Sequence, residues 1–331
     1  MKKLITVGPK KTQVIDVGIP EITAPNQVKV KLKYCGVCMS EHYDWKVAGK
    51  DCFGHEPVGT VCEVGSGVTE FKVGDRVSGL FAGHKEYVVT EEENLFHLPD
   101  NVSDEDGTLE PLSCLISAVS KVKIAMIGER VAVVGCGYMG CGAISLLKLR
   151  GAYVVAVDIR EECLKDAKRC GADEVYTPDT LPANYFYKVG GGLDFRGEPG
   201  GFSLVMEWGE TNESLDLAIN MTRMCGQLAI GAYHTGGKRL VDVQQLNVKA
   251  IDCLSTHPRE KDMNMRGCSL ATKMLSDGTW NFKGLPTKIY PISRFDEAQG
   301  DLETKYGTYM KALVDFERDD FEPYVINAVK D

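Results

Sequence analysis

The first hundred residues alternate short apolar runs with turns rich in glycine and proline. In 27–34, valine and leucine alternate with lysine, which is typical of a strand with one buried face. The strands predicted from this pattern span 27–34, 58–64, 75–77 and 86–89. We therefore expect a mainly antiparallel β domain at the start of the chain.

From residue 130 the pattern changes to uninterrupted apolar runs that alternate with segments of helical periodicity. Such runs are typical of strands buried on both faces, as in a parallel sheet. The predicted strands are 130–134, 153–157, 203–206 and 227–230, and the predicted helices are 138–150, 161–169 and 213–221. This alternation predicts a doubly wound parallel sheet.

Outside this repeating part, a capping pattern at Ser103-Asp104-Glu105-Asp106 predicts a helix that begins near 103 and runs towards 123. A further helix is expected at 262–276 and a strand at 311–316. The fold class is therefore α/β in two domains. We expect a mainly β domain at 1–115 and 257–331, with a Rossmann domain at 116–256 inserted between its two parts.

Composition narrows the class of protein. The 331 residues include 38 Lys and Arg against 47 Asp and Glu, a net charge of −9, which is the opposite of the balance in a typical nucleic-acid-binding protein. Neither a signal peptide nor a run of about 20 apolar residues is present, so we expect no membrane partner and a cytoplasmic location. The twelve cysteines should then be reduced, and serve as small packing residues, metal ligands or catalytic thiols rather than form disulfides.

The segment Gly135-Cys136-Gly137-Tyr138-Met139-Gly140 follows a predicted buried strand and opens a helix. Its glycines permit a tight turn and let the backbone at Gly135, Gly137, Met139 and Gly140 approach a pyrophosphate closely. The helix N-terminus supplies partial positive charge for the phosphates. Asp158 ends the second strand, 18 residues after Gly140, where its carboxylate can bind ribose hydroxyls. This arrangement predicts a dinucleotide site.

Two residues near the end of that strand bear on the choice of dinucleotide. Asp158 would repel a 2′-phosphate, which favours NAD over NADP. Arg160 could bind such a phosphate or flank the adenine. We expect NAD.

The pair Cys35-Gly36-Val37-Cys38 suggests a zinc finger, but no second Cys-x-x-Cys pair follows at the required spacing. The residues around this pair are explained better by two further segments, Gly54-His55-Glu56-Pro57-Val58-Gly59 and Val73-Gly74-Asp75-Arg76-Val77. Together with Cys38 and the glycine motif, these segments closely resemble the zinc-dependent medium-chain alcohol dehydrogenases. The resemblance extends from about residue 25 to about residue 316. It implies a GroES-like catalytic domain beside the Rossmann domain.

The resemblance also implies the ligands of a catalytic zinc ion. Cys38 and His55 fall on two ligand positions, and Glu110, 25 residues before Gly135, falls on the third. Cys114 is a rival for the third position. Glu56 is implied as a neighbouring or exchangeable ligand. Zinc accepts sulfur, nitrogen and carboxylate oxygen, and a catalytic site keeps one position open.

A proton path and a cofactor contact are carried over from the same family. Ser40 falls where a Ser or Thr accepts the alcohol proton, but the relay histidine five residues after the ligand cysteine is replaced by Tyr43. His42 lies one residue early and could complete the relay, with direct loss of the proton to water as the alternative. Lys311 falls on a basic residue that contacts the cofactor pyrophosphate, or is simply a surface charge.

The segment Glu110-Pro111-Leu112-Ser113 resembles the polyol and sugar dehydrogenase branch. The implied activity is hydride transfer between a secondary alcohol (a polyol, sugar or cyclitol) and NAD, in a homodimer or homotetramer. Since 78–86 lacks the four cysteines of a structural zinc lobe, we expect one zinc ion per subunit. Three alternatives remain open: an amino-alcohol dehydrogenase of the threonine type, a zinc-free quinone or enoyl reductase, and a catalytically silent nucleotide-binding protein.

Overall fold

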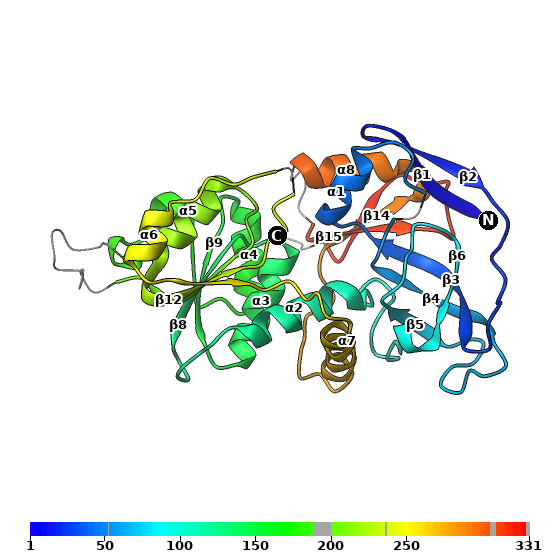
Figure 1. The fold of residues 1–331 in the computed structure, drawn as a ribbon, viewed down its shortest axis with the longest axis horizontal. Coiled ribbons are helices and arrows are strands. Elements are labelled where there is room, and N and C mark those ends of the chain that lie inside the picture. Colours follow the sequence, from blue (N-terminus) through cyan, green and yellow to red (C-terminus); the bar gives the residue numbers. More distant parts are fainter. Residues whose placement is uncertain (52, 188–199, 236, 305–308, 329–331) are drawn as a thin grey trace. The chain divides into compact units, whose positions relative to one another are not determined.

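The computed structural model describes residues 1–51, 53–187, 200–235, 237–304 and 309–328 (Figure 1). The chain forms two compact units, one made of 1–113 and 261–331 and the other of 114–260. In the part of the chain that is described, no helix is long and apolar enough to cross a membrane.

The 114–260 unit is built on a six-stranded sheet in which every neighbouring pair is parallel. Its strand order is β10-β9-β8-β11-β12-β13, so the order reverses direction between β8 and β11. These strands are β8 (Arg130–Val134), β9 (Tyr153–Val157), β10 (Glu174–Tyr176), β11 (Phe202–Glu207), β12 (Thr222–Ile230) and β13 (Asp252–Ser255). This order is that of a dinucleotide-binding Rossmann fold.

The helices of this unit follow the strands along the chain, as the sequence predicts (Figure 1). They are α3 (Tyr138–Leu149), α4 (Glu161–Arg169), α5 (Asn212–Met221) and α6 (Val243–Val248), with short 3₁₀ turns η3 (Pro178–Thr180) and η4 (Ala183–Tyr185). Each of the central strands β8 and β9 has four fully buried residues, which is why their sequences are continuously apolar.

The other unit contains an eight-stranded, mainly antiparallel sheet with the path β16-β14-β15-β3-β4-β5-β7, and β6 pairs with β3. Only β14 and β15 run parallel. The strands are β3 (Gln27–Gly36), β4 (Pro57–Val64), β5 (Arg76–Gly79), β6 (Tyr87–Glu91), β7 (Leu95–His97), β14 (Thr287–Pro291), β15 (Lys311–Asp315) and β16 (Tyr324–Ile326). A separate hairpin is formed by β1 (Lys2–Gly8) and β2 (Lys11–Asp16).

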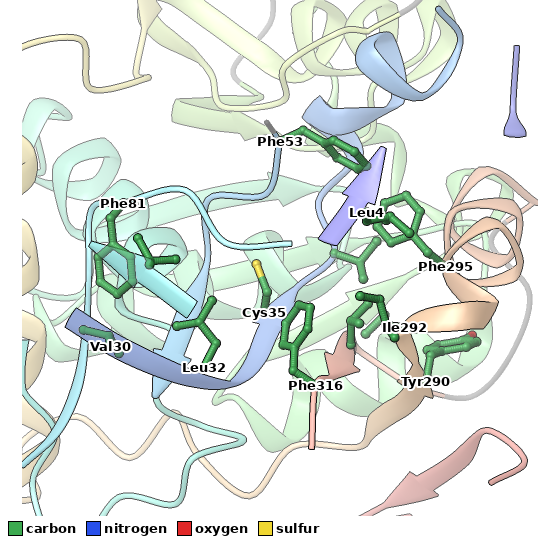
Figure 2. Close-up of a cluster of buried hydrophobic side chains, with 14 of the residues drawn as sticks. Leu4, Val30, Leu32, Cys35, Phe53, Phe81, Tyr290, Ile292, Phe295 and Phe316 are labelled. Carbon is green, nitrogen blue, oxygen red and sulfur yellow. The ribbon is translucent and has the colours of Figure 1, made fainter. Parts of the chain in front are cut away.

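The core of this unit joins residues that are far apart in sequence. Leu32 and Cys35 of β3 pack in one cluster with Phe53, Phe295 and Phe316 (Figure 2). Phe53 and Phe295 meet edge to face with ring centroids 5.4 Å apart. Trp45 is also in this cluster. Trp280, elsewhere in the unit, is 1% exposed, so Trp45, Phe53 and Trp280 are all buried.

Helices cover part of this sheet. They are α1 (His42–Trp45), α7 (Lys261–Ser276) and α8 (Phe295–Thr304), with 3₁₀ turns η1 (Met39–Glu41), η2 (Glu92–Asn94) and η5 (Ile292–Arg294). A further helix, α2 (Leu109–Lys121), begins in this unit and continues into the other. The prediction that α2 begins near Ser103 is wrong, since it begins at Leu109. Ser103 does bond the backbone N–H and the carboxylate of Asp106, but that carboxylate also accepts from the N–H of Gly284. The capping pattern therefore closes a turn that is held by another part of the chain.

The described cysteines fall into three groups by burial, of which the half-buried one comprises Cys38, Cys114 and Cys170. Cys35, Cys136, Cys141, Cys163 and Cys268 are buried, as expected for packing thiols. The same expectation is wrong for Cys62, Cys225 and Cys253, which are exposed, and Cys52 lies outside the described residues.

Candidate active site and metal centre

Strand pairing explains why Cys38 and His55 come together. Cys38 follows the end of β3, and His55 and Glu56 precede the start of β4. Because β3 and β4 pair antiparallel, with Cys35 opposite Pro57, the end of one strand lies beside the start of the next. The backbone N–H of Gly36 donates to the carbonyl of Glu56 and fixes this junction.

Among the described residues, one group of His, Cys, Asp and Glu could hold a metal ion, and it consists of Cys38, His55 and Glu56. The possible ligand atoms of these three residues all lie within 4.8 Å of one another. Sulfur, imidazole nitrogen and carboxylate oxygen make up a donor set that suits zinc. The residues present therefore fit this metal.

Ser40 lies at the edge of the same group. Its hydroxyl donates to Cys38 Sγ at 3.3 Å and lies 3.5 Å from His55 Nε2. The 3₁₀ turn η1, which begins directly after Cys38, brings the serine side chain back towards the cysteine. A hydroxyl beside these two residues could exchange a proton with a substrate hydroxyl held by a metal ion that they bind.

Glu41 was missed by the sequence reasoning. Its carboxylate is 3% exposed and lies 3.3 Å from His55 Nδ1 and 3.1 Å from His84 Nε2. A metal-binding histidine commonly directs its second ring nitrogen to a carboxylate, which fixes the ring and its tautomer. Glu41 thus leaves His55 Nε2 for the metal. The only signal in the sequence is an acidic residue three positions after Cys38, which also suits the first turn of a helix.

These contacts determine the charge of the buried groups. Burial would raise the pKa of Glu41, but His84 and His55 lower it to about 2, so the carboxylate is ionised at neutral pH. Burial would lower the pKa of His84, but Cys35 and Glu41 raise it to about 10. Burial would also lower the pKa of His55, but Cys38 and Glu41 raise it well above its usual range.

His42 faces another element. Its Nδ1 lies 3.0 Å from Gln299 Oε1 and its Nε2 lies 3.3 Å from Glu303 Oε1, both on α8. The ring is 2% exposed and lies against Trp45, with centroids 5.0 Å apart. Both ring nitrogens therefore face groups of the protein itself, while Tyr43 next to it is 70% exposed.

Glu56 and Lys311 form a buried ion pair beside the metal-binding group, with the carboxylate 1% and the lysine 7% exposed. Gly36 makes room for this pair, since a Cβ there would lie 1.9 Å from Glu56 Oε2. Lys311 is therefore not a free surface charge, which was one of its two interpretations. Its ammonium compensates the charge of a carboxylate that could also serve a metal.

Glu110, the third zinc ligand expected from the family resemblance, lies in the first turn of α2 and is half-buried. It is not part of the group whose ligand atoms lie within 4.8 Å of one another, and neither is Cys114. The structure thus gathers Glu56 with Cys38 and His55, and the assignment of Glu110 stays a prediction.

The glycine motif lies in the turn between β8 and α3. Gly135 has φ of +91°, and a Cβ there would lie 2.6 Å from the backbone N of Gly209. A Cβ on Gly140 would lie 1.9 Å from the carbonyl oxygen of Gly135, so this position needs glycine for helix–strand packing. At Gly137 nothing lies within 4 Å of an added Cβ, so packing alone does not require glycine there. Met139 belongs to the first turn of α3, whose N-cap is Gly137.

Asp158, directly after β9, is oriented by the glycine loop. Its Oδ2 accepts from the backbone N–H of Cys136 at 2.7 Å, and its Oδ1 accepts from that of Arg160 at 2.9 Å. The guanidinium of Arg160 lies 3.4 Å from Oδ1 and points back to the carboxylate. The carboxylate predicted to bind the ribose therefore lies directly after the second strand, and its binding role stays a prediction.

Comparison with known proteins relates both units to characterised families. The family model described as "Alcohol dehydrogenase GroES-like domain" matches 24–100, and that described as "Zinc-binding dehydrogenase" matches 139–264. The (R,R)-butanediol dehydrogenase of Bacillus subtilis (strain 168) is 31% identical over 280 residues, which cover 69% of this chain and 78% of that protein. The chain belongs to the zinc-dependent medium-chain dehydrogenases. The family resemblance, the two-part fold and the class of oxidoreductases acting on CH–OH groups are thereby confirmed.

Longer matches place the chain in the polyol branch of these dehydrogenases. The sorbitol dehydrogenase of Halalkalibacterium halodurans is 28% identical over 336 residues, which cover 89% of this chain and 93% of that protein. The crystal structure of 2R,3R-butanediol dehydrogenase from Bacillus subtilis has the same fold, with a TM-score of 0.74 and 24% identity, and covers 95% of this chain and 99% of that one. The medium-chain dehydrogenase fold therefore extends over almost the whole chain.

Proposed function

We propose that this medium-chain dehydrogenase oxidises a secondary alcohol of the polyol, sugar or cyclitol class and transfers the hydride to NAD. The observation that carries the proposal is the position of Ser40, whose hydroxyl contacts both Cys38 and His55 within the one metal-binding group of the described residues. A proton acceptor beside a Lewis-acid site is what alcohol oxidation requires.

Zinc bound to this group would polarise the substrate hydroxyl and lower its pKa. The protein's own residues do the rest. Ser40 Oγ accepts the hydroxyl proton and passes its own proton to solvent water. The C–H hydrogen leaves with its electron pair as hydride to the dinucleotide, so that the carbinol becomes a carbonyl. The Glu41 carboxylate faces His55 Nδ1, so a metal ion would bind at Nε2 and displace the proton there, and Lys311 balances the charge of Glu56.

We propose one zinc ion per subunit, with Cys38 and His55 as fixed ligands and Glu110 or Glu56 as the third. The two carboxylates make different predictions. If Glu110 is the resident ligand, Glu110→Ala removes zinc from the purified protein and Glu56→Ala leaves most of it in place. Zinc content measured by elemental analysis on both variants decides between them, and the reverse pattern would assign the third position to Glu56.

We also propose NAD as the dinucleotide, because the ionisable carboxylate of Asp158 lies at the ribose end of the predicted site and would repel a 2′-phosphate. Arg160 is held towards that carboxylate rather than pointing away from it. Titration with NADH and NADPH tests this choice, and tighter binding of NADPH would contradict it.

We expect a homodimer or homotetramer in the cytoplasm. The outermost strand of the parallel sheet, β13, has three exposed residues out of four, which leaves an edge that a second copy of the chain could cover. Light scattering during size-exclusion chromatography measures the assembly.

The test of the function is a panel of polyols, sugar acids, cyclitols and amino alcohols, followed by the absorbance of the reduced nicotinamide. We expect turnover of at least one polyol, sugar or cyclitol by the zinc-loaded enzyme, and none by Cys38→Ala. Turnover of amino alcohols alone would replace the substrate class, and full activity of Cys38→Ala would exclude the mechanism.

A further inference from the structure

The ends of β11 and β12 carry a polar network that neither the glycine motif nor the metal-binding group explains. Glu207, the last residue of β11, is fully buried, and its Oε2 accepts from His234 Nε2 at 2.9 Å. Arg239 Nε donates to the other ring nitrogen, His234 Nδ1, at 3.2 Å. Because arginine can only donate, Nδ1 must be the acceptor and Nε2 must carry the proton. The two partners thus fix one neutral tautomer of His234.

The same network ties the segment after β12 to the segment after β11. Arg239 Nη2 donates to the carbonyls of Glu210 at 3.0 Å and Thr235 at 2.8 Å. The Glu210 carboxylate accepts from both the N–H and the hydroxyl of Thr235, at 2.8 and 2.6 Å. Glu207 Oε1 also accepts from the backbone N–H of Glu210 at 2.9 Å. All the hydrogen bonds between the described residues of the two segments have their donors after β12 and their acceptors at or after the end of β11, and they tie the two segments together.

Backbone strain accompanies these contacts. His234 has φ of +53° and Glu210 has φ of +64°, values that non-glycine residues rarely adopt. Such conformations persist where surrounding contacts impose them. Gly231, just before this segment, lies so close to Trp208 that a Cβ would come within 2.5 Å of the indole ring. The network therefore holds a strained and tightly packed segment in one shape.

The place of this network in the fold suggests its role. A doubly wound sheet is built from two mononucleotide-binding halves that meet where the strand order reverses. The half formed by β8, β9 and β10 carries the glycine motif and Asp158, the features of the adenosine side. The half formed by β11, β12 and β13 is left for the nicotinamide nucleotide. The tied segments leave the carboxyl ends of β11 and β12, the edge at which ligands of such sheets bind.

We propose that Glu207, His234 and Arg239 form a positioning network that presets the segment 231–235 for the nicotinamide half of the bound dinucleotide. This inference rests on the proposed function, since it assumes that the site takes NAD. A preset segment loses less conformational freedom on binding, which strengthens the affinity without a direct contact from His234. The network should then affect NADH but not ADP-ribose, which lacks the nicotinamide.

The experiment compares the full-length wild type with His234→Ala and His234→Gln. Glutamine can donate to Glu207 and accept from Arg239, whereas alanine can do neither. We expect His234→Ala to weaken NADH binding about tenfold, the scale of one lost hydrogen bond to a charged group, and to leave ADP-ribose binding within about twofold of wild type. His234→Gln should recover most of the NADH affinity. The KM for NAD should rise in His234→Ala while the KM for the alcohol stays unchanged.

If His234→Ala weakens the binding of NADH and ADP-ribose equally, the unit is damaged in general and the proposal is overturned. Unchanged NADH binding by His234→Ala would also overturn it, and so would failure of His234→Gln to restore the NADH affinity. Asp158→Ala serves as the matched control, because loss of a contact on the adenosine side should weaken both ligands. If the wild type binds neither NADH nor ADP-ribose, the proposed function itself fails and the network role falls with it. That outcome is distinct from an altered response to the variants alone.

Discussion

Replacing Glu41 by glutamine tests whether this buried carboxylate supports both the fold and the metal-binding group. The side chain keeps its size but loses the negative charge that faces His55 and His84. The pKa of Glu41 falls from 4.5 to about 2 in the folded chain. Since one pKa unit corresponds to about 1.4 kcal/mol, the ionised carboxylate stabilises the folded state by about 3 kcal/mol. Breaking a buried charge pair costs a similar amount, about 3–5 kcal/mol.

We therefore expect urea unfolding of metal-free Glu41→Gln at neutral pH to show a loss of about 3 kcal/mol. The folded-state pKa lies below the unfolded value, so the contribution of Glu41 is complete above pH 4.5 and disappears as the pH falls towards 2. Wild type and variant should converge in acid. Zinc affinity, measured by competition with a chelator, should fall by about 10- to 100-fold, because the imidazole of His55 loses the group that orients it.

Glu63→Gln is the matched control for this experiment. Glu63 lies on β4, its side chain is 52% exposed, and it pairs with Lys29 at the surface. Exposed ion pairs contribute about 0–1 kcal/mol, so this variant should retain both its stability and its zinc affinity. If Glu41→Gln unfolds at the same urea concentration as wild type and binds zinc equally well, the reasoning about Glu41 is refuted.

Three other predictions concern separate parts of the molecule. Gly140→Ala should lose about 1–3 kcal/mol of stability and also NADH affinity, because its Cβ would lie 1.9 Å from the Gly135 carbonyl oxygen. Gly137→Ala should fold normally and lose only NADH affinity, since nothing lies within 4 Å of its Cβ. Urea unfolding and NADH titration separate the two effects. Ser40→Ala should lower kcat about 100-fold or more at unchanged zinc content while Ser40→Thr retains activity, and an active alanine variant would remove Ser40 from the proton path. Burial lowers the pKa of Lys249 to about 8, so the unfolded chain binds more protons than the folded chain between pH 8 and 10.5. The free energy of unfolding of the wild type should therefore rise over this range relative to that of Lys249→Met. A difference between the two proteins that does not change with pH would contradict this.

Local patterns were sufficient to predict much of the Rossmann unit. The apolar runs that form β8 and β9 are buried on both faces, so each run is continuously apolar and could be recognised as a strand from its own residues. Gly135, Gly140 and Asp158 follow these strands at spacings that the turn and the second strand impose. Cys38 and His55 were predicted as metal ligands from the family motifs in the segments around them, and the structure brings their side chains together.

The remaining features depend on contacts between distant segments. Glu41 meets His84 across 43 residues, and Glu56 meets Lys311 across 255, through pairing and packing that no local window contains. His42 was predicted as a relay from its distance to Cys38, but its ring orientation depends on α8, which lies more than 250 residues away. Likewise, the residues from Ser103 to Asp106 suit the start of a helix. They form a turn instead, because the carboxylate of Asp106 also accepts from the backbone N–H of Gly284, which is distant in sequence.

The sequence by itself therefore determined the two-domain α/β fold, the position of the glycine-rich turn and the residue types of the candidate metal ligands. Those features need only residue type, spacing and burial, which are properties of a continuous segment. The tertiary structure alone decided which charged groups face one another around His55, Glu56 and His234. A buried charge is stable only beside a compensating partner, and that partner is supplied by whichever segment the fold brings to it.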